Sequence, residues 1–312
     1  MDASFDILQA TEIIRDLLEA GHIAQASELL TASGIVPLEM PDLNLTGASL
    51  CGLSLRGLRI PGANLSEADL SNVDLTGADL SGANLTRARL IGARLCGATL
   101  HGAILQDART ARLDLRGAQM DTVIVRGCSL RGVDLRGASM RKARLIHVSL
   151  HGVRLDGADL RGTTTDALVA RGGSMRGVNL RRGQLSGARL EQVDLRDADL
   201  FDVDFSQATL TGVKFHGSDL RGASFRGASL EGSELPAVSF QGVDLVDATL
   251  YAADLSSADL SGATLSEEDF DDVDEGYIYR VARLSGVITD GRTRWPQDFD
   301  ATEAALFTDA AV

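Results

Sequence analysis

Aliphatic residues recur at every fifth position through most of the chain. Counting from Leu45 to Phe270 in steps of five gives 46 sites without an insertion or deletion, and 43 of these sites hold Leu, Phe, Ile, Met or Val. The residue two places earlier is mostly Ala or Val, and 26 of the 33 glycines lie two places after an aliphatic site. A fixed short period of this kind predicts a repeat architecture.

The period of five fits neither an α-helix, with 3.6 residues per turn, nor a simple strand, which alternates every two residues. Two inward residues in five, separated by one outward residue, predict a short extended side followed by a turn that glycine relieves. Four such sides would close a coil of 20 residues, although the pattern alone does not fix the number four. Residues 20 apart would then form a column, in which Phe205 stacks on Phe225 between Leu185 and Leu245.

The repeated sequence Ala-(Asp/Asn)-Leu, as in Ala68-Asp69-Leu70 and Ala258-Asp259-Leu260, resembles the pentapeptide-repeat family. The resemblance covers roughly three quarters of the chain. It implies an all-β solenoid, a right-handed four-sided parallel β-helix with four pentapeptides per coil. The 46 repeats then make about 11.5 coils, and the ~4.8 Å spacing of paired strands predicts a length of roughly 55 Å.

We divide the chain into three parts. Residues 1–40 carry two short helical patterns and form either a cap on the open end of the core or a docking hairpin. Residues 41–270 form the β-helix. Residues 271–312 form a C-terminal cap and tail, in which Trp295 and Phe299 would cover the last coil. Residues 301–312 are alternatively a terminal helix through which a homodimer forms.

Some repeats in the middle of the chain depart from the pattern. Small or polar residues take inward positions there, which predicts poorer packing and lower local stability. We interpret this region either as tolerated repeat decay or as a bend that adapts to a ligand. The residues concerned are Thr163, Thr165, Ala170, Gly173 and Gly183.

The composition favours a cytoplasmic protein. No run approaches 18 apolar residues, so no transmembrane helix is expected, and the acidic N-terminus is unlike a secretory signal. The three cysteines, Cys51, Cys96 and Cys128, are odd in number and irregularly spaced, which favours free thiols in a reducing compartment.

Charge is unevenly distributed along the chain. The net charge of −14 disfavours direct binding of nucleic acid or anionic membranes through the whole surface. However, residues 101–180 hold 13 bases against 7 acids, whereas residues 181–312 hold 25 acids against 11 bases. A basic middle segment and an acidic C-terminal part follow from these counts.

Two candidate surfaces follow from the repeat register. A basic docking strip would place guanidinium groups roughly 5 Å apart in one column, unless neighbours such as Asp159 and Asp199 neutralise it. The strip consists of Arg141, Arg161, Arg181 and Arg221. The acidic surface consists of Asp194, Asp199, Asp204, Asp219, Glu234, Asp244, Asp254 and Asp259.

No arrangement of residues predicts catalysis, a cofactor or a metal ion. His101 and Asp121 are the one stacked pair that could orient an imidazole, and no nucleophile lies in a matching position. The histidines and cysteines lack metal-ligand spacing. We therefore expect neither a cofactor nor an enzyme active site.

The leading functional hypothesis is a non-enzymatic protein-binding scaffold that presents charged side-chain columns to a protein partner. The resemblance implies an alternative, in which the acidic surface mimics DNA and binds bacterial type II topoisomerase (gyrase), protecting it from poisons. The basic middle segment interrupts the negative surface that this alternative requires. The sequence does not identify the partner.

Overall fold

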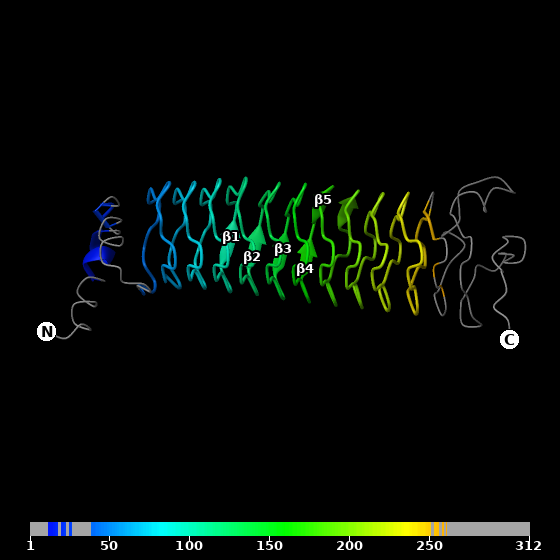
Figure 1. The fold of residues 1–312 in the computed structure, drawn as a ribbon. Coiled ribbons are helices and arrows are strands. Elements are labelled where there is room, and N and C mark those ends of the chain that lie inside the picture. Colours follow the sequence, from blue (N-terminus) through cyan, green and yellow to red (C-terminus); the bar gives the residue numbers. More distant parts are fainter. Residues whose placement is uncertain are drawn as a thin grey trace, which may run out of the picture. The chain divides into compact units, whose positions relative to one another are not determined.

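The computed structural model describes residues 12–17, 20–22, 25–26, 39–250, 253–255, 258 and 260. It divides into two compact units, Met1–Ser149 and Leu150–Val312, and each is described by itself. In both units the main chain forms the parallel coils of a β-solenoid (Figure 1).

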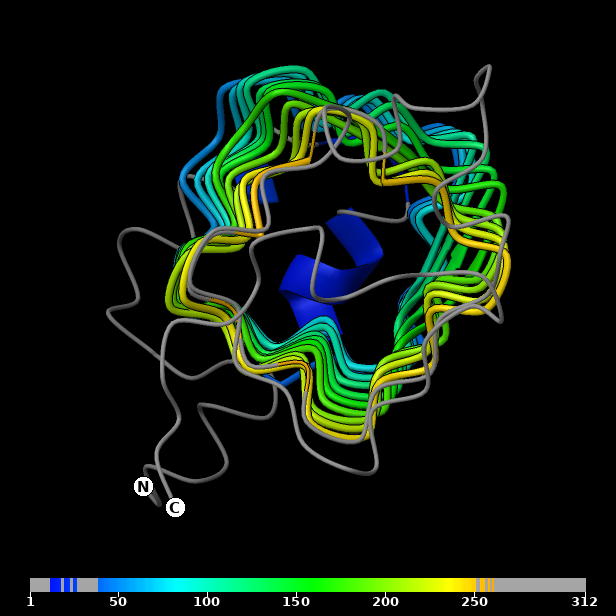
Figure 2. The ribbon, with the colours of Figure 1, turned by 90° about the vertical axis from the view of Figure 1, so that its right-hand side faces the viewer.

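The register of the coils is 20 residues. In the first unit Asn64 forms a parallel bridge with Asn84, and the amide of Leu65 donates to the carbonyl of Asn84 at 2.8 Å. In the second unit Asp199 pairs with Asp219 in the same way. Twenty residues are four pentapeptides, so each coil has four sides, and the coils of each unit overlie one another along the axis (Figure 2). The predicted parallel β-helix is confirmed.

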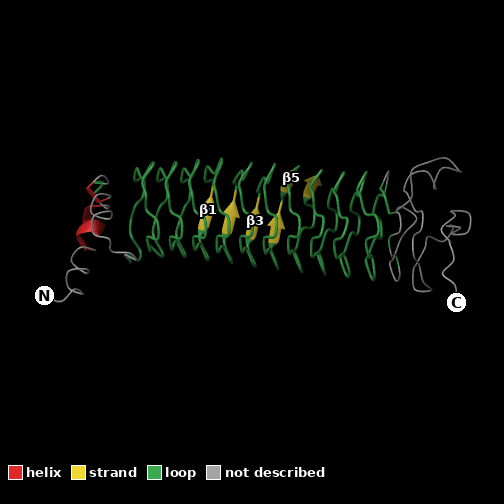
Figure 3. Ribbon diagram, in the orientation of Figure 1, coloured by secondary structure: helices red, strands yellow, loops and turns green. Residues whose placement is uncertain are grey.

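In the coils that the structure describes, six sides form strands of three residues, and the bridges outside them are single pairs between turns (Figure 3). The first unit contains β1 (Ile104–Gln106), β2 (Ile124–Arg126) and β3 (Arg144–Ile146), which pair in parallel in this order. The second contains β4 (Thr164–Asp166), β5 (Val169–Arg171) and β6 (Arg189–Glu191), and β5 pairs in parallel with β6.

The aliphatic positions fill the interior of each unit. Every described fifth position from Met40 to Leu260 is buried, with Thr165 as the exception. In the second unit the ring of Phe205 stacks on that of Phe225, with centroids 5.3 Å apart and planes at 22°, as the register predicts. Since burying a Leu or Phe side chain contributes about 1.5–3 kcal/mol, this interior dominates the stability of the fold.

The turn that ends each side requires a left-handed backbone. Among the described residues, seventeen non-glycine residues have positive φ, and all of them lie two places after a fifth-position site. The glycines at this phase follow from that constraint, because glycine adopts positive φ without the steric cost that a Cβ imposes.

Some of the irregular inward positions of the second unit are buried, and others are not. Thr163 and Ala170 are fully buried, whereas Thr165 is partly exposed and donates its hydroxyl to the carbonyl of Gln184 at 3.1 Å. Gly173 has φ of +98°, and a Cβ added there would lie 2.7 Å from the carbonyl oxygen of Val153. The main chain of the neighbouring coil therefore occupies the space that a side chain fills elsewhere.

The end segments lie largely outside the described residues. Residues 12–17 are helical, in agreement with the first predicted helical pattern, and Ile14 is buried. The division at residues 40 and 270, the C-terminal cap with Trp295 and Phe299, and the terminal helix stay predictions. So does the number of about 11.5 coils.

Replacing Gly173 by Ala should destabilise the second unit. The added Cβ meets the Val153 main chain at a positive φ, and overpacking with backbone strain predicts a loss of roughly 3 kcal/mol. A shift of the urea unfolding midpoint measures this loss.

Gly177→Ala is the matched control for this substitution. Gly177 has φ of +60°, but nothing lies within 4 Å of an added Cβ, so we expect a loss of only about 1 kcal/mol. Equal losses in the two variants would show that the neighbouring coil does not approach Gly173 as described.

Candidate functional site

The outer surface consists of three positions in each pentapeptide, the residue before the buried aliphatic site and the two after it. Where the first of these is Asp or Asn, its side chain usually accepts a hydrogen bond from the main-chain amide two residues later. Asp79, for example, accepts from the amide of Ser81 at 3.0 Å and from its hydroxyl at 2.6 Å. These carboxylates and amides therefore stabilise the turns, so their presence alone does not indicate a binding site.

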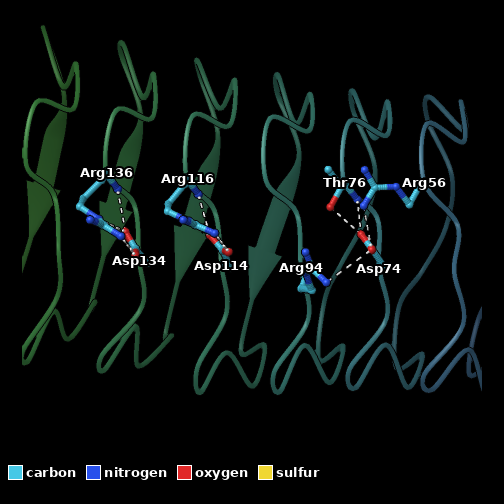
Figure 4. Close-up of polar contacts among 8 residues, drawn as sticks. All are labelled: Arg56, Asp74, Thr76, Arg94, Asp114, Arg116, Asp134 and Arg136. Carbon is cyan, nitrogen blue, oxygen red and sulfur yellow. Dashed lines mark hydrogen bonds and ion pairs between the residues drawn. The ribbon is translucent and has the colours of Figure 1, made fainter.

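Five Asp-Leu-Arg sequences add an ion pair to this turn. In Asp114-Leu115-Arg116 the guanidinium donates from Nε to Oδ1 at 2.9 Å and from Nη2 to Oδ2 at 2.7 Å (Figure 4). Asp134 and Arg136 repeat this geometry one coil further on. The other members lie in the second unit: Asp159–Arg161, Asp194–Arg196 and Asp219–Arg221.

These contacts shift the acid–base equilibria of the carboxylates. Hydrogen bonds from the guanidinium two residues later lower the pKa of Asp114, Asp194 and Asp219 below the ordinary value of 3.8. The charged form of each carboxylate is thus favoured in the folded state.

Every member of the predicted basic strip contacts a carboxylate. Arg141, in the first unit, donates from Nε to Asp121 at 2.8 Å. In the second unit Arg161 pairs with Asp159 and Arg221 with Asp219, at 2.6 Å and 2.7 Å.

The remaining member of the strip, Arg181, lies 3.3 Å from Asp199 and has its guanidinium carbon 4.4 Å from the centroid of the Phe201 ring. The register places Arg161, Arg181 and Arg221 on one corner of the second unit, with Phe201 between the last two. Three members of the strip therefore share one column of the second unit, and acids neutralise the charge on which the proposed docking role depends.

The predicted acidic residues do not share one face of the second unit. The main-chain pairing places them on three of the four sides: Asp194, Glu234 and Asp254 on one, Asp199 and Asp219 on another, Asp204 and Asp244 on a third. Asp259 lies outside the described residues.

Most of these acids have a local partner. Asp194, Asp199, Asp219 and Glu234 form ion pairs with Arg196, Arg181, Arg221 and Lys214. Asp204 and Asp244 accept hydrogen bonds from the main-chain amides of Ser206 and Val246.

Cations without a carboxylate partner form a set that the predicted strip omits. In the described part of the first unit six exposed side chains have no ion pair: Arg109, Arg112, Arg126, Arg131, Lys142 and Arg144. The sequence marks most of this set, because only Arg109 has an acid two places before it, Asp107, and none of the six has an acid 20 places away in a described coil of this unit. The signal is incomplete, since Arg56 also lacks an acid at these spacings and yet pairs with Asp74, 18 residues further on.

The candidate catalytic pair does not form. The carboxylate of Asp121 accepts hydrogen bonds from Ser139 and Arg141, not from His101. Burial raises the pKa of the Cys128 thiol to about 11, and its Sγ donates to the carbonyl of Leu105 at 3.0 Å. Among the described residues no group of three or more His, Cys, Asp or Glu side chains could hold a metal ion.

This geometry defines a β-solenoid repeat protein with a filled interior and an outer surface of ordered polar columns. The chain belongs to the pentapeptide repeat family. The family model for pentapeptide repeats matches it in eight copies, over residues 42–77, 63–102, 78–109, 126–162, 170–197, 198–235 and 235–266. No curated protein gives a significant match.

Several solved structures are similar to the chain. HetL, a pentapeptide repeat protein involved in heterocyst differentiation regulation in the cyanobacterium Nostoc sp. strain PCC 7120, is 25% identical over 84% of this chain and 93% of its own, with a TM-score of 0.32. AT2G44920, a pentapeptide repeat protein from the thylakoid lumen of Arabidopsis thaliana, is 27% identical. The similarity covers 33% of this chain and 62% of its own, with a TM-score of 0.26.

QnrB1, a plasmid-mediated fluoroquinolone resistance protein, is 20% identical over 81% of this chain and 94% of its own in the full-length structure, with a TM-score of 0.17. These TM-scores are low, and the likenesses carry no argument about function.

Within the described residues, no helix has the length and apolarity that crossing a membrane requires.

The Asp-Leu-Arg geometry predicts unequal effects of removing its two members. Asp194→Ala removes the acceptor of both the Arg196 amide, at 3.2 Å, and the Arg196 guanidinium, at 2.8 Å. Arg196→Ala removes only a surface ion pair. We expect the free energy of unfolding to fall by about 1–2 kcal/mol in Asp194→Ala and by under about 1 kcal/mol in Arg196→Ala. Urea unfolding measures both losses. A larger loss for Arg196→Ala would contradict the capping role of the carboxylate.

Stability should fall in acid. The pKa values of Asp114, Asp194 and Asp219 are lower in the folded state than the ordinary 3.8, so the unfolded chain binds more protons below about pH 4. Their contribution is present above that pH and is lost as the pH falls through the folded pKa values. We expect the urea midpoint to be flat above about pH 5 and to decline below about pH 4. In the triple Asp→Asn variant the decline should be shallower, and an unchanged decline would exclude these groups as its source.

Proposed function

We propose that the chain is a non-enzymatic scaffold that binds a protein partner through the ordered columns of its outer surface. The observation that supports this proposal is the burial of the inward positions. The side chains of Leu80, Leu85 and Leu90 are 0% exposed, so apolar side chains fill the interior of this described part of the solenoid. The outer positions repeat at the ~4.8 Å spacing of paired strands, which suits recognition of an extended surface.

Capture with cross-linking tests this proposal. Intact chains carrying a photoreactive amino acid at outer positions, one in each unit, are used to capture partners, and the cross-linked residues are identified by mass spectrometry. We expect one protein to be captured reproducibly, to bind the purified chain at fixed stoichiometry, and to cross-link to outer positions. Failure to bind any purified candidate, together with measurable turnover that His101→Ala abolishes, would support an enzyme instead.

Repeating the capture without residues 1–40 distinguishes the two interpretations of the N-terminal segment. Binding that survives the truncation in a chain that remains folded favours a cap, and binding that is lost favours a docking hairpin. We place the interaction in the cytoplasm, in keeping with three free cysteine thiols.

The gyrase-directed alternative has weaker support from the surface geometry. A DNA mimic needs an extended negative surface, whereas the candidate acids lie on three sides and four of them pair with bases. A supercoiling assay with purified gyrase tests it. Neither inhibition nor protection from a topoisomerase poison at micromolar protein would remove this alternative.

A further inference from the structure

One side of the first unit departs from the polar pattern of the outer surface. The residue before the buried aliphatic site is Asn in three successive coils, at Asn44, Asn64 and Asn84, and then becomes Ile104 and Ile124. Isoleucine cannot accept the hydrogen bond that closes the turn, and the main chain continues there as the strands β1 and β2. This change creates a small sheet, β1–β2–β3, on one side of the coils.

The outer face of this sheet combines apolar and basic side chains. Alternate residues of a strand point to the same side, so the buried side chains of Leu105, Val125 and Leu145 leave their neighbours facing outward. We call these neighbours the β1–β3 outer face: Ile104, Gln106, Ile124, Arg126, Arg144 and Ile146. Parallel pairing places Ile104 beside Ile124 and Arg126 beside Ile146, and all three isoleucines are partly exposed.

The two arginines of this face lack acidic partners. Both are exposed, and among the described residues neither has a carboxylate within ion-pair distance. Two acids near this face contact other residues. Asp121 accepts hydrogen bonds from Arg141 and Ser139, and Asp107 accepts one from Gln106 at 3.3 Å. The face thus retains two positive charges beside uncovered apolar surface, unlike the neutralised arginines elsewhere.

This combination favours a polypeptide over a nucleic acid as the ligand. Phosphates would satisfy Arg126 and Arg144 but leave the isoleucines uncovered, and the face holds no aromatic side chain on which bases could stack. A peptide with carboxylates between bulky apolar side chains would complement both, since interfaces combine an apolar centre with complementary charge. We propose that the β1–β3 outer face binds an acidic polypeptide segment of this kind. The inference rests on the proposed scaffold function and names its surface and the chemistry of its partner.

Fluorescence polarisation with a labelled nine-residue peptide of alternating Glu and Leu tests the proposal on the full chain. Two control peptides replace Leu by Ser or Glu by Gln, and a 20-base-pair DNA duplex is the nucleic-acid probe. We expect the Glu-Leu peptide to bind, and each control peptide and the duplex to bind roughly tenfold more weakly or not at all. Tighter binding of the duplex would overturn the choice of a polypeptide.

A pair of charge-matched variants locates the binding. Arg126→Glu/Arg144→Glu should weaken peptide binding by roughly tenfold or more, because two complementary charges become repulsive. Arg112→Glu/Arg131→Glu changes the net charge equally at two unpaired, exposed arginines outside the face, and should alter binding by less than about twofold. Equal weakening in both variants would mean non-specific attraction and would overturn the proposal. Circular dichroism and urea midpoints establish that both variants are folded.

The chain itself contains an acidic run with apolar residues, EEDFDDVDE at Glu267–Glu275, which could compete with the probe. A full-length variant with the acids of this run replaced by amides removes that competition. If the Glu-Leu peptide binds the native chain or this variant, and Arg126→Glu/Arg144→Glu abolishes that binding, the result supports the β1–β3 outer face as the binding surface. If the peptide binds neither form, the proposal is overturned. A captured partner that cross-links elsewhere would leave the scaffold function standing while excluding this face.

Discussion

The structure depends on a main-chain register of 20 residues, repeated without interruption through the described coils of each unit. Parallel hydrogen bonds between residues 20 apart fix every side chain in a column, inward or outward, for as long as the register holds. The inward columns supply most of the stability, because a buried Leu contributes about 1.5–3 kcal/mol and an exposed ion pair about 0–1 kcal/mol. Outer side chains such as Arg126 can therefore change with little cost to the fold, and for this reason we propose the outer surface as the binding surface.

The sequence predicts most of this architecture because the period of five is a direct consequence of the geometry. Each side buries two residues and each turn needs a left-handed residue, so Leu, Ala and Gly recur in fixed phases, and the stacking of Phe205 on Phe225 follows from the register alone. Gly173 is an instructive exception. By composition it looks like an eroded repeat, yet its φ of +98° and the approach of the Val153 main chain require glycine there. This constraint comes from the main chain of the neighbouring coil, so the residue types at equivalent repeat positions do not predict it.

The candidate surfaces were less predictable, because charge counts do not show which charges pair. Arg161 and Arg221 lie in the expected column, but an Asp two residues earlier neutralises each of them. Conversely, no acid among the described residues neutralises Arg126 or Arg144. Ile124 stands two residues before Arg126 and pairs with Arg144 on the next strand, where an aspartate could have formed an ion pair. The useful question for this fold is therefore local: whether the nearest acid lies on the same turn as the base, as in Asp159–Arg161, or on the next coil, as in Arg181–Asp199.

Single-cysteine scanning through one coil, from Ser81 to Leu100, tests the central claim most directly. Each residue is replaced in turn in a chain whose native cysteines are changed to Ser, and the rate of thiol modification is measured under native conditions. The register predicts protection at the inward positions, such as Ala83, Leu85, Ala88 and Leu90, and fast reaction at the outward positions between them. Protection with any other period, or equal reactivity throughout the coil, would contradict it.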